Sequence, residues 1–157
     1  MARTRTPVVS GWFTGEEAAA PNGRPGAFRL LGTRCSACTA VFFPREDVHC
    51  RNPHCPGGGE LAEVPLSPRG RVWSYTDGRY RPPAPYVCDP AEPWVPYTLV
   101  AVELEAERMV VLGQAAPGIG VADLEVGMEV EVVGGVLNET PDTTWTTWHF
   151  KPVGGAS

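Results

Sequence analysis

Short stretches in which hydrophobic and polar residues alternate recur along the second half of the chain, with glycine- and proline-rich segments between them. A period of two is typical of a β-strand with one buried face, whereas an amphipathic helix repeats every three to four residues. The alternation predicts five strands, at residues 71–76, 96–105, 109–115, 128–133 and 143–151. These strands, with a short connection at 119–126, favour a small closed Greek-key barrel of the OB type. Periodicity leaves a fragment of a β-sandwich as the alternative.

Parity assigns the side chains of two of these strands to faces. In the first strand, Val72 and Ser74 are expected on one face, and Trp73 and Tyr75 on the other. The alternation in the second strand breaks near Glu103, which indicates a β-bulge or the rim of the barrel. Its residues divide into Thr98, Val100 and Val102 on one face and Leu99, Ala101 and Leu104 on the other.

The first half of the chain has shorter patterns. Residues 1–10 are predicted to be a flexible lead, and residues 8–20 a short helix or turn that carries Trp12 and Phe13. Three short strands are predicted, at residues 27–34, 41–44 and 61–64. The chain is thereby divided into an N-terminal extension at 1–26, a small β unit at 27–66 and the barrel at 67–153.

Composition supports a mainly β protein. Glycine (18) and proline (17) make up 35 of the 157 residues, and 43% of the residues are hydrophobic, so a packed core is expected. No apolar run approaches the length of a bilayer-spanning helix, and residues 1–30 lack the apolar segment of a secretory signal. We therefore expect a cytoplasmic protein in a reducing compartment.

Charge is distributed unevenly along the chain. Residues 1–81 hold 11 arginines and 7 acidic residues, a net of +4, whereas residues 82–157 hold 2 basic and 11 acidic residues, a net of −9. Together they give the net charge of −5. A basic half joined to an acidic half limits the possible partners more than the net value does.

Four cysteines lie within 21 residues with the spacing C-x2-C-x11-C-x4-C, and they are Cys35, Cys38, Cys50 and Cys55. Two close pairs of thiolates suit the tetrahedral sulfur site that Zn²⁺ prefers. We interpret residues 27–66 as a zinc ribbon, because so short a segment buries too little apolar surface to fold without a metal. Four thiolates leave no position for water, so the zinc is expected to be structural. Two disulfides are the alternative, which a reducing compartment disfavours.

Two histidines and a fifth cysteine lie near or beyond this motif. His49 and His54 each precede a cysteine of the second pair, so either is an alternative zinc ligand, although four cysteines already complete the tetrahedron. Cys88 lies in a proline-rich segment and is interpreted as an ordinary free thiol, because no base adjoins it in sequence.

The sequence holds no recognisable catalytic constellation. The third histidine, His149, lies on the last predicted strand and is interpreted as a structural or surface residue. The carboxylates of the barrel half alternate with valine and leucine, which is typical of the solvated face of a strand. Gly118-Ile-Gly120 lacks the third glycine of a dinucleotide-binding loop. A non-catalytic role is favoured.

Residues 77–97 form the most distinctive segment outside the cysteine motif. About 20 residues without secondary structure are uncommon in a compact domain and are usually functional. The segment is rich in proline, which lowers the entropy lost on docking, and in the residue types that dominate interfaces. A surface loop that covers one mouth of the barrel is the alternative. The candidate contact residues for a partner or ligand are Arg79, Tyr80, Arg81, Tyr86, Trp94 and Tyr97.

The order of ribbon and barrel resembles a known family over residues 28–152. It is similar to the rubredoxin-like zinc-ribbon plus OB-fold proteins that are catalogued as domain of unknown function thirty-five. The second knuckle departs from the family's usual C-P-x-C, because two extra residues separate Cys50 and Cys55. The matching motifs are Cys35-Ser-Ala-Cys38, Phe42-Phe-Pro-Arg45, Gly70-Arg-Val-Trp-Ser-Tyr-Thr76, Pro96-Tyr-Thr-Leu-Val-Ala-Val-Glu-Leu104 and Leu124-Glu-Val-Gly-Met-Glu-Val-Glu-Val132.

The resemblance implies an accessory subunit. Members of this family associate with thiolase-fold partners, thiolases or retro-aldol lyases, that act on acyl-CoA thioesters, some of them in steroid side-chain or aromatic acyl-CoA degradation. It therefore implies a thiolase-like or aldolase partner in a heterotetramer. The partner would supply the catalytic residues, with acyl-CoA at or near the interface and no membrane involved.

A single-stranded nucleic-acid-binding module is the competing hypothesis. Zinc ribbons and OB barrels both serve this purpose, and Trp73 with Tyr75 could stack on bases. The net charge of −5, with −9 in the barrel half, disfavours it, because binding to a phosphate backbone needs a basic groove.

Overall fold

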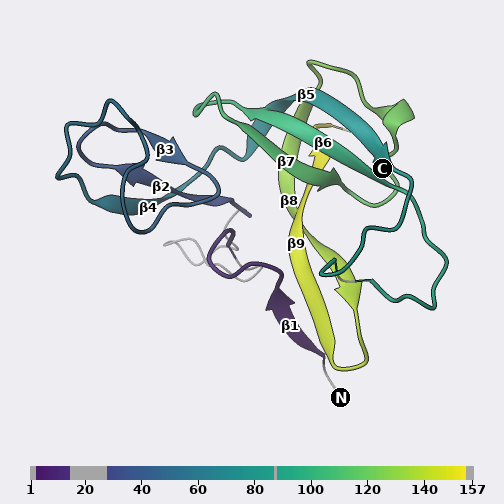
Figure 1. Cartoon of the computed structure of the whole chain (residues 1–157). Coiled ribbons are helices and arrows are strands. Elements are labelled where there is room, and N and C mark those ends of the chain that lie inside the picture. The colour runs from purple at the N-terminus through teal and green to yellow at the C-terminus, as the bar shows by residue number, and fades with distance from the viewer. Residues whose placement is uncertain (1–2, 15–27, 87, 155–157) are drawn as a thin grey trace.

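The chain folds into two β-sheets that lie side by side (Figure 1). A computed structural model describes residues 3–14, 28–86 and 88–154. The smaller sheet has the order β3-β2-β4 and consists of β2 (Leu31–Cys35), β3 (Val41–Phe42) and β4 (Leu61–Pro65), all antiparallel. Its strands are short because the chain between them turns twice to form the cysteine knuckles.

The larger sheet closes into the predicted barrel. Five of the six strands of this sheet form the barrel, and they are β5 (Arg69–Gly78), β6 (Tyr97–Leu104), β7 (Val110–Ala115), β8 (Glu129–Glu139) and β9 (Thr143–Pro152) in the described part of the chain. The order β5-β6-β7-β9-β8 returns to β5, and the β7–β9 pair is parallel. This is the topology of an OB barrel, which confirms the barrel and excludes the sandwich fragment.

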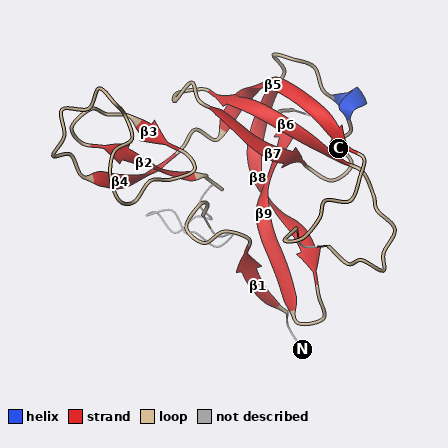
Figure 2. Cartoon of the chain, in the orientation of Figure 1, coloured by secondary structure: helices blue, strands red, loops and turns tan. Residues whose placement is uncertain are grey.

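The connection between β7 and β8 contains a short 3-10 helix, η1 (Val121–Asp123), in the predicted segment 119–126 (Figure 2). The rest of the described chain is strand, turn and loop. No helix in this part of the chain is long and apolar enough to cross a membrane. The fold is therefore mainly β, as the composition predicts.

The bulge lies in β5 rather than near Glu103. Thr98, Val100, Val102 and Leu104 of β6 are all buried, so the alternation continues past Glu103 and the placement of Leu104 on the opposite face is wrong. The register of β5 instead shifts between Val72 and Ser74. An extra residue in one strand reverses the parity of all that follow.

This bulge separates the two aromatic side chains of β5. Trp73, the extra residue, is 60% exposed. Tyr75 packs against the hydrophobic core, so the prediction that Trp73 and Tyr75 share a face is wrong.

Strand β8 continues well beyond the predicted end at residue 133. The alternation stops at Gly134 and Gly135, which have no side chains to reveal a face, but the backbone still pairs with β9 as far as Glu139. The β8–β9 hairpin consequently projects beyond the other barrel strands (Figure 1).

The N-terminal residues are ordered by pairing with this hairpin. Strand β1 (Thr4–Pro7) adds in parallel to β9, with Thr4 opposite Thr143, so the prediction of a flexible lead at 1–10 is wrong for the residues of this strand, and residues 1–2 lie outside the described residues. Alternation could not reveal so short an edge strand. Residues 8–14 form a turn that ends in a bridge between Phe13 and Leu30, and the remainder of the predicted 8–20 segment lies outside the described residues.

The ribbon and the barrel share one core. Leu30 and Leu66, which flank the smaller sheet, are fully buried in the same cluster as the barrel residues. Trp12 of the N-terminal segment contacts Phe43 of the ribbon and Trp148 of β9, with ring centroids 5.5 and 6.2 Å apart. The domain boundaries at 26 and 66 stay predictions, since the packing is continuous across the second of them.

Candidate metal centre and aromatic loop

The first cysteine knuckle is held by backbone bonds at the end of β2. The Cys35 N–H donates to Ala40 O and the Thr39 N–H to Cys35 O, each at 2.9 Å, which closes the turn between Cys35 and Cys38. A reciprocal pair joins the knuckle to the chain before β4: the Ser36 N–H donates to Glu60 O, and the Glu60 N–H to Ser36 Oγ.

The chain that follows the second knuckle passes so close to the first knuckle that glycine is required at position 59. A Cβ atom on Gly59 would lie 2.7 Å from Cys35 Sγ and 2.7 Å from Ala37 Cβ, which no side chain can accommodate. Gly57 and Gly58 adopt φ angles of 85° and 71°, the left-handed region that favours glycine. The run of three glycines at 57–59 therefore provides both the turn and the room for the sulfur atoms.

The four sulfur atoms meet in one cluster. Cys35 Sγ lies 3.8 Å from Cys55 Sγ, Cys38 Sγ lies 3.5 Å from Cys50 Sγ, and all four are within 4.8 Å of one another. A tetrahedron with Zn–S bonds of about 2.3 Å has edges of about 3.8 Å, so the cluster fits a zinc ion. These four residues would hold it, and bound zinc would cross-link the two knuckles.

Hydrogen bonds favour the thiolate form unequally across the cluster. The Ala40 backbone N–H and the Asn52 side chain lower the pKa of Cys38 to about 6. The Asn52 N–H favours the Cys50 thiolate, but desolvation and bonds to the other three thiols raise its pKa to about 12. Without a cation, the neighbouring thiols therefore cannot all ionise at neutral pH, and a divalent ion supplies the missing charge.

Neither neighbouring histidine joins the cluster. His49 and His54 are exposed, and among the described residues the metal-competent group contains the four cysteines alone. The His54 N–H is used to close a turn with the Asn52 side chain at 3.0 Å. The geometry favours the all-cysteine ligand set over the histidine alternative.

Four of the six predicted contact residues converge in the loop between β5 and β6. Tyr86 and Tyr97 stack with their planes 9° apart, and Trp94 meets both rings edge-on, with centroids 6.0 and 5.5 Å away. The Arg81 guanidinium lies 5.9 Å from the Trp94 ring and donates to Asp89 O and Glu92 O. We call these four residues the aromatic cluster.

The cluster is fastened to the barrel at two points. Trp94 Nε1 donates to Gly78 O and Gln114 Nε2 to the Tyr86 hydroxyl, both at 3.1 Å. Desolvation in this packing raises the pKa of Tyr97, with smaller contributions from Tyr86 and Tyr80. The loop is thus internally packed, which gives it a defined shape.

The other two predicted contact residues lie apart from the cluster. Tyr80 is 76% exposed, and Arg79 pairs with Asp77 at 3.0 Å. Cys88 lies within the loop, 3.8 Å from an Arg81 nitrogen.

A pocket of about 360 Å³ separates this loop from the end of β8. Leu137 and Asn138 of β8 line it, together with loop residues that include Arg81, Asp89 and Glu92. The sequence analysis did not identify Leu137 and Asn138, because the alternation of side chains along a strand does not show which distant loop packs beside it.

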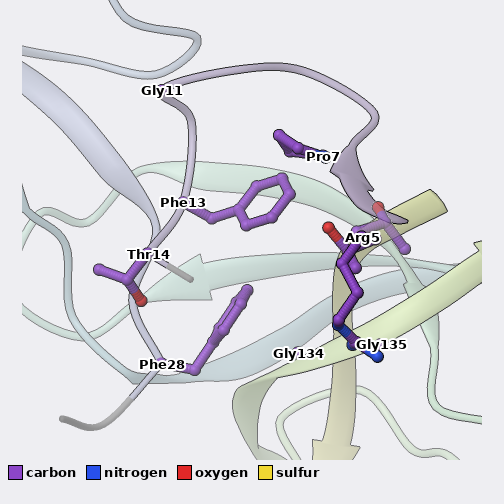
Figure 3. A pocket seen from close by; sticks show the side chains of 10 residues that line it. Arg5, Pro7, Gly11, Phe13, Thr14, Phe28, Gly134 and Gly135 are labelled. Carbon is purple, nitrogen blue, oxygen red and sulfur yellow. The ribbon is translucent and has the colours of Figure 1, made fainter. Parts of the chain in front are cut away.

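A second cavity, of about 430 Å³, lies between the N-terminal segment and the hairpin. Figure 3 shows Phe13 and Phe28 projecting toward it, with Arg5 of β1 directed toward Gly134 and Gly135.

The buried histidine of β9 lies against Gly135. A Cβ atom on Gly135 would be 2.2 Å from His149 Nδ1, so only glycine fits there. His149 is 3% exposed, and its Nδ1 has no hydrogen-bond partner among the described residues. Burial lowers the pKa of His149, which keeps the ring neutral. The interpretation as a structural residue is consistent with this environment.

The ribbon segment matches a known zinc-ribbon family. Residues 26–62, which contain all four cysteines, match the family described as ChsH2, rubredoxin-like zinc ribbon domain. Together with the thiol cluster, this match confirms the predicted rubredoxin-like ribbon and its structural Zn²⁺.

Most of the chain is similar to curated scaffold proteins. A DUF35 domain-containing scaffold protein of Methanocaldococcus jannaschii is 32% identical over 126 residues, which cover 79% of this chain and 82% of that protein. A DUF35 domain-containing scaffold protein of Methanothermobacter thermautotrophicus is 32% identical over 132 residues, with coverages of 81% and 87%.

A solved structure shares the ribbon and barrel arrangement. A chain of the Ltp2-ChsH2(DUF35) aldolase superposes with a TM-score of 0.57 at 29% identity, over 79% of this chain and 84% of that one. The similarity therefore extends over both sheets and is not confined to the cysteine motif.

Proposed function

Because this chain belongs to the DUF35 family, we propose that it is the non-catalytic scaffold subunit of a thiolase-fold enzyme that acts on acyl-CoA thioesters. The similarity to scaffold proteins and to a subunit of an aldolase supports an accessory role beside an aldolase-like partner. The ribbon holds a structural zinc, and the partner supplies the reacting groups.

The observation that carries this proposal is the similarity over four-fifths of the chain to the DUF35 part of an aldolase. The chemistry of the described residues is consistent with a scaffold. Four thiolates close the zinc site to water, and His149, the buried histidine, has no nucleophile bonded to it. The aromatic cluster supplies rings and a guanidinium of the kinds that dominate interfaces.

The aromatic cluster and the stoichiometry of the complex make the proposal more specific. We place the loop that carries the aromatic cluster at the partner interface, overhanging the acyl-CoA channel, in a heterotetramer with two copies of each chain. Thiolase and retro-aldol chemistry both fit this arrangement, with a steroid or an aromatic acyl chain.

The nucleic-acid hypothesis loses its main structural support. The bulge in β5 places Tyr75 against the core and leaves Trp73 alone on the surface, so the two rings offer no stacking platform. On β7, which is separated from β5 by β6, Leu112 is 64% exposed, whereas an oligonucleotide would need a cationic groove.

Co-expression with a thiolase-fold protein encoded beside it tests the proposal. We expect the two chains to co-purify, and the complex to turn over an acyl-CoA thioester that this chain alone leaves intact. A control with the four cysteines intact and the partner's active site inactivated should keep the complex and lose the turnover. Turnover by this chain alone, or two chains that elute separately, would contradict the proposal.

A further inference from the structure

Beyond Val132, no strand of the described part of the chain pairs with the outer edge of β8. Strand β5 pairs with β8 only at residues 129–131, after which the Val132 N–H donates to Pro68 O at 2.8 Å. Alternate residues of an antiparallel strand direct their N–H and C=O groups to the same edge. Gly134 and Val136 therefore direct theirs to the side of Val132, away from β9.

Neither Gly134 nor Val136 has a backbone partner on that edge within residues 3–14, 28–86 and 88–154. Gly134 is partly accessible and Val136 is 39% exposed. Since Gly134 and Gly135 have no side chains, another backbone can approach closely. The opposite edge of the hairpin, on β9, carries β1. Unpaired groups on an exposed edge are a template for a further strand.

The charges around this edge indicate the character of such a strand. The pocket at the end of β8 is lined by the carboxylates of Asp89 and Glu92 and by Arg81, whose guanidinium donates to the backbone carbonyls of the same two residues. Asp142 lies in the exposed hairpin turn. The Asp89 carboxylate accepts the Ala91 N–H at 2.8 Å, and within the described residues none of these three carboxylates forms an ion pair. A strand with lysine or arginine residues complements them.

We propose that the outer edge of β8, residues 132–136, binds an extended basic segment of the thiolase-fold partner as an added β-strand. This inference rests on the proposed function and adds the edge of β8 to the partner interface that includes the aromatic cluster. Backbone hydrogen bonds to Gly134 and Val136 hold the segment, and its cationic side chains reach the Asp89 and Glu92 carboxylates in the pocket beside Leu137 and Asn138.

Two variants at Val136 separate the edge donor from the side chain. V136P removes the N–H that points to the open edge and leaves the alternate bonds to β9, whereas V136T keeps the N–H and the β-branched shape. We expect V136P to weaken binding to the partner about tenfold or more, and V136T to change it less than about twofold. Equal affinities for the two variants would overturn the proposal.

Hydrogen exchange of the wild-type chain decides the matter even where V136P fails to fold. The amides of Gly134 and Val136 should exchange rapidly in the isolated chain and slowly in the complex, whereas the Gly135 amide, bonded to β9, should be slow in both. A complex in which Gly134 and Val136 still exchange rapidly overturns the edge assignment and leaves the proposed function standing. If the wild-type complex does not form, both the edge assignment and the proposed function are contradicted. Protection that rises with the concentration of the isolated chain assigns the edge to a second copy and also overturns the proposal.

Discussion

At the scale of single residues, the zinc cluster shows how spacing, backbone bonds and charge combine. Each knuckle brings two sulfur atoms together, and Gly59 lets the second knuckle come within contact distance of Cys35. The raised pKa of Cys50, about 12, and the lowered pKa of Cys38, about 6, describe thiols that compete for ionisation. A divalent cation removes the competition, so metal binding and folding of the ribbon are coupled.

Replacement of one cluster cysteine tests this coupling. C55S should lose most of the bound zinc and unfold the ribbon, because three thiolates and a weak hydroxyl ligand hold the ion poorly. The matched control C88S removes the thiol beside Arg81, outside the cluster, and should keep one zinc per chain. Metal content by elemental analysis and thermal unfolding are the measurements. A C55S protein with full zinc would assign the fourth ligand elsewhere.

The buried His149 gives the barrel a dependence on pH. Burial lowers the pKa of His149 below its ordinary value of 6.5, so the folded state binds fewer protons than the unfolded state. Its neutral form contributes fully above pH 6.5, and stability is lost as the pH falls through that value toward the folded pKa. Among the described residues no acceptor lies within hydrogen-bond distance of Nδ1, so a positive charge on the protonated ring would not be stabilised.

The control for this effect is H149F, which keeps a ring against Gly135 but cannot be protonated. The measurement is the free energy of unfolding in urea at pH 8, 7, 6 and 5, with zinc in excess. Below pH 6.5 the wild type should lose unfolding free energy that H149F retains. If the two unfolding free energies differ by the same amount at every pH in this range, the titration of His149 does not affect stability.

At the scale of elements, the loop between β5 and β6 carries the residues that we propose contact the partner. Its prolines and its two anchors, Trp94 to Gly78 and Gln114 to Tyr86, hold the aromatic cluster in a fixed arrangement before any partner binds. A preorganised loop loses little conformational entropy on docking.

Deletion of residues 82–94 should therefore abolish co-purification with the partner, because it removes Tyr86 and Trp94 and releases Arg81. Zinc content and barrel stability should change little, since the loop lies outside the core cluster. The measurement is the fraction of partner retained by the tagged chain, with Y80S, which alters an exposed residue outside the cluster, as the control. Undiminished retention by the deletion variant would place the interface elsewhere.

Sequence patterns predicted the elements well wherever side chains alternate or ligands recur. The cysteine spacing indicated the ribbon and its metal, and the five alternating strands indicated the barrel. The extension of β8 was missed because Gly134 and Gly135 interrupt the alternation. The bulge in β5 was missed because counting alternate residues assumes a regular strand and does not reveal one extra residue. Strand β1 was missed because its four residues depend on β9, an element far away in sequence.

At the scale of the whole molecule, the N-terminal segment joins the ribbon to the barrel. Trp12, Phe43 and Trp148 come from three separate parts of the chain and contact one another. The Arg45 side chain bonds to Gly11 O at 3.0 Å and pairs with Glu63 at 2.7 Å, which ties the same segment to the ribbon. The state of the zinc site is therefore expected to affect packing at the barrel surface.

Removal of zinc by a chelator should loosen this junction without unfolding the barrel. We expect tryptophan emission to shift to longer wavelength as Trp12 and Trp148 gain solvent, while slow amide exchange in β6 persists because its buried residues belong to the barrel core. W12F should reduce the emission change, and readdition of zinc should reverse it. An unchanged spectrum after complete removal of the metal would show that the ribbon packs independently of its ion.

Native mass spectrometry of the complex purified after co-expression tests the central claim most directly, because one mass reports both the metal and the partner. We expect an assembly that contains equal numbers of this chain and of the thiolase-fold chain, two of each, with one zinc ion for every copy of this chain. A mass that corresponds to this chain alone, or to an assembly without zinc, would contradict it.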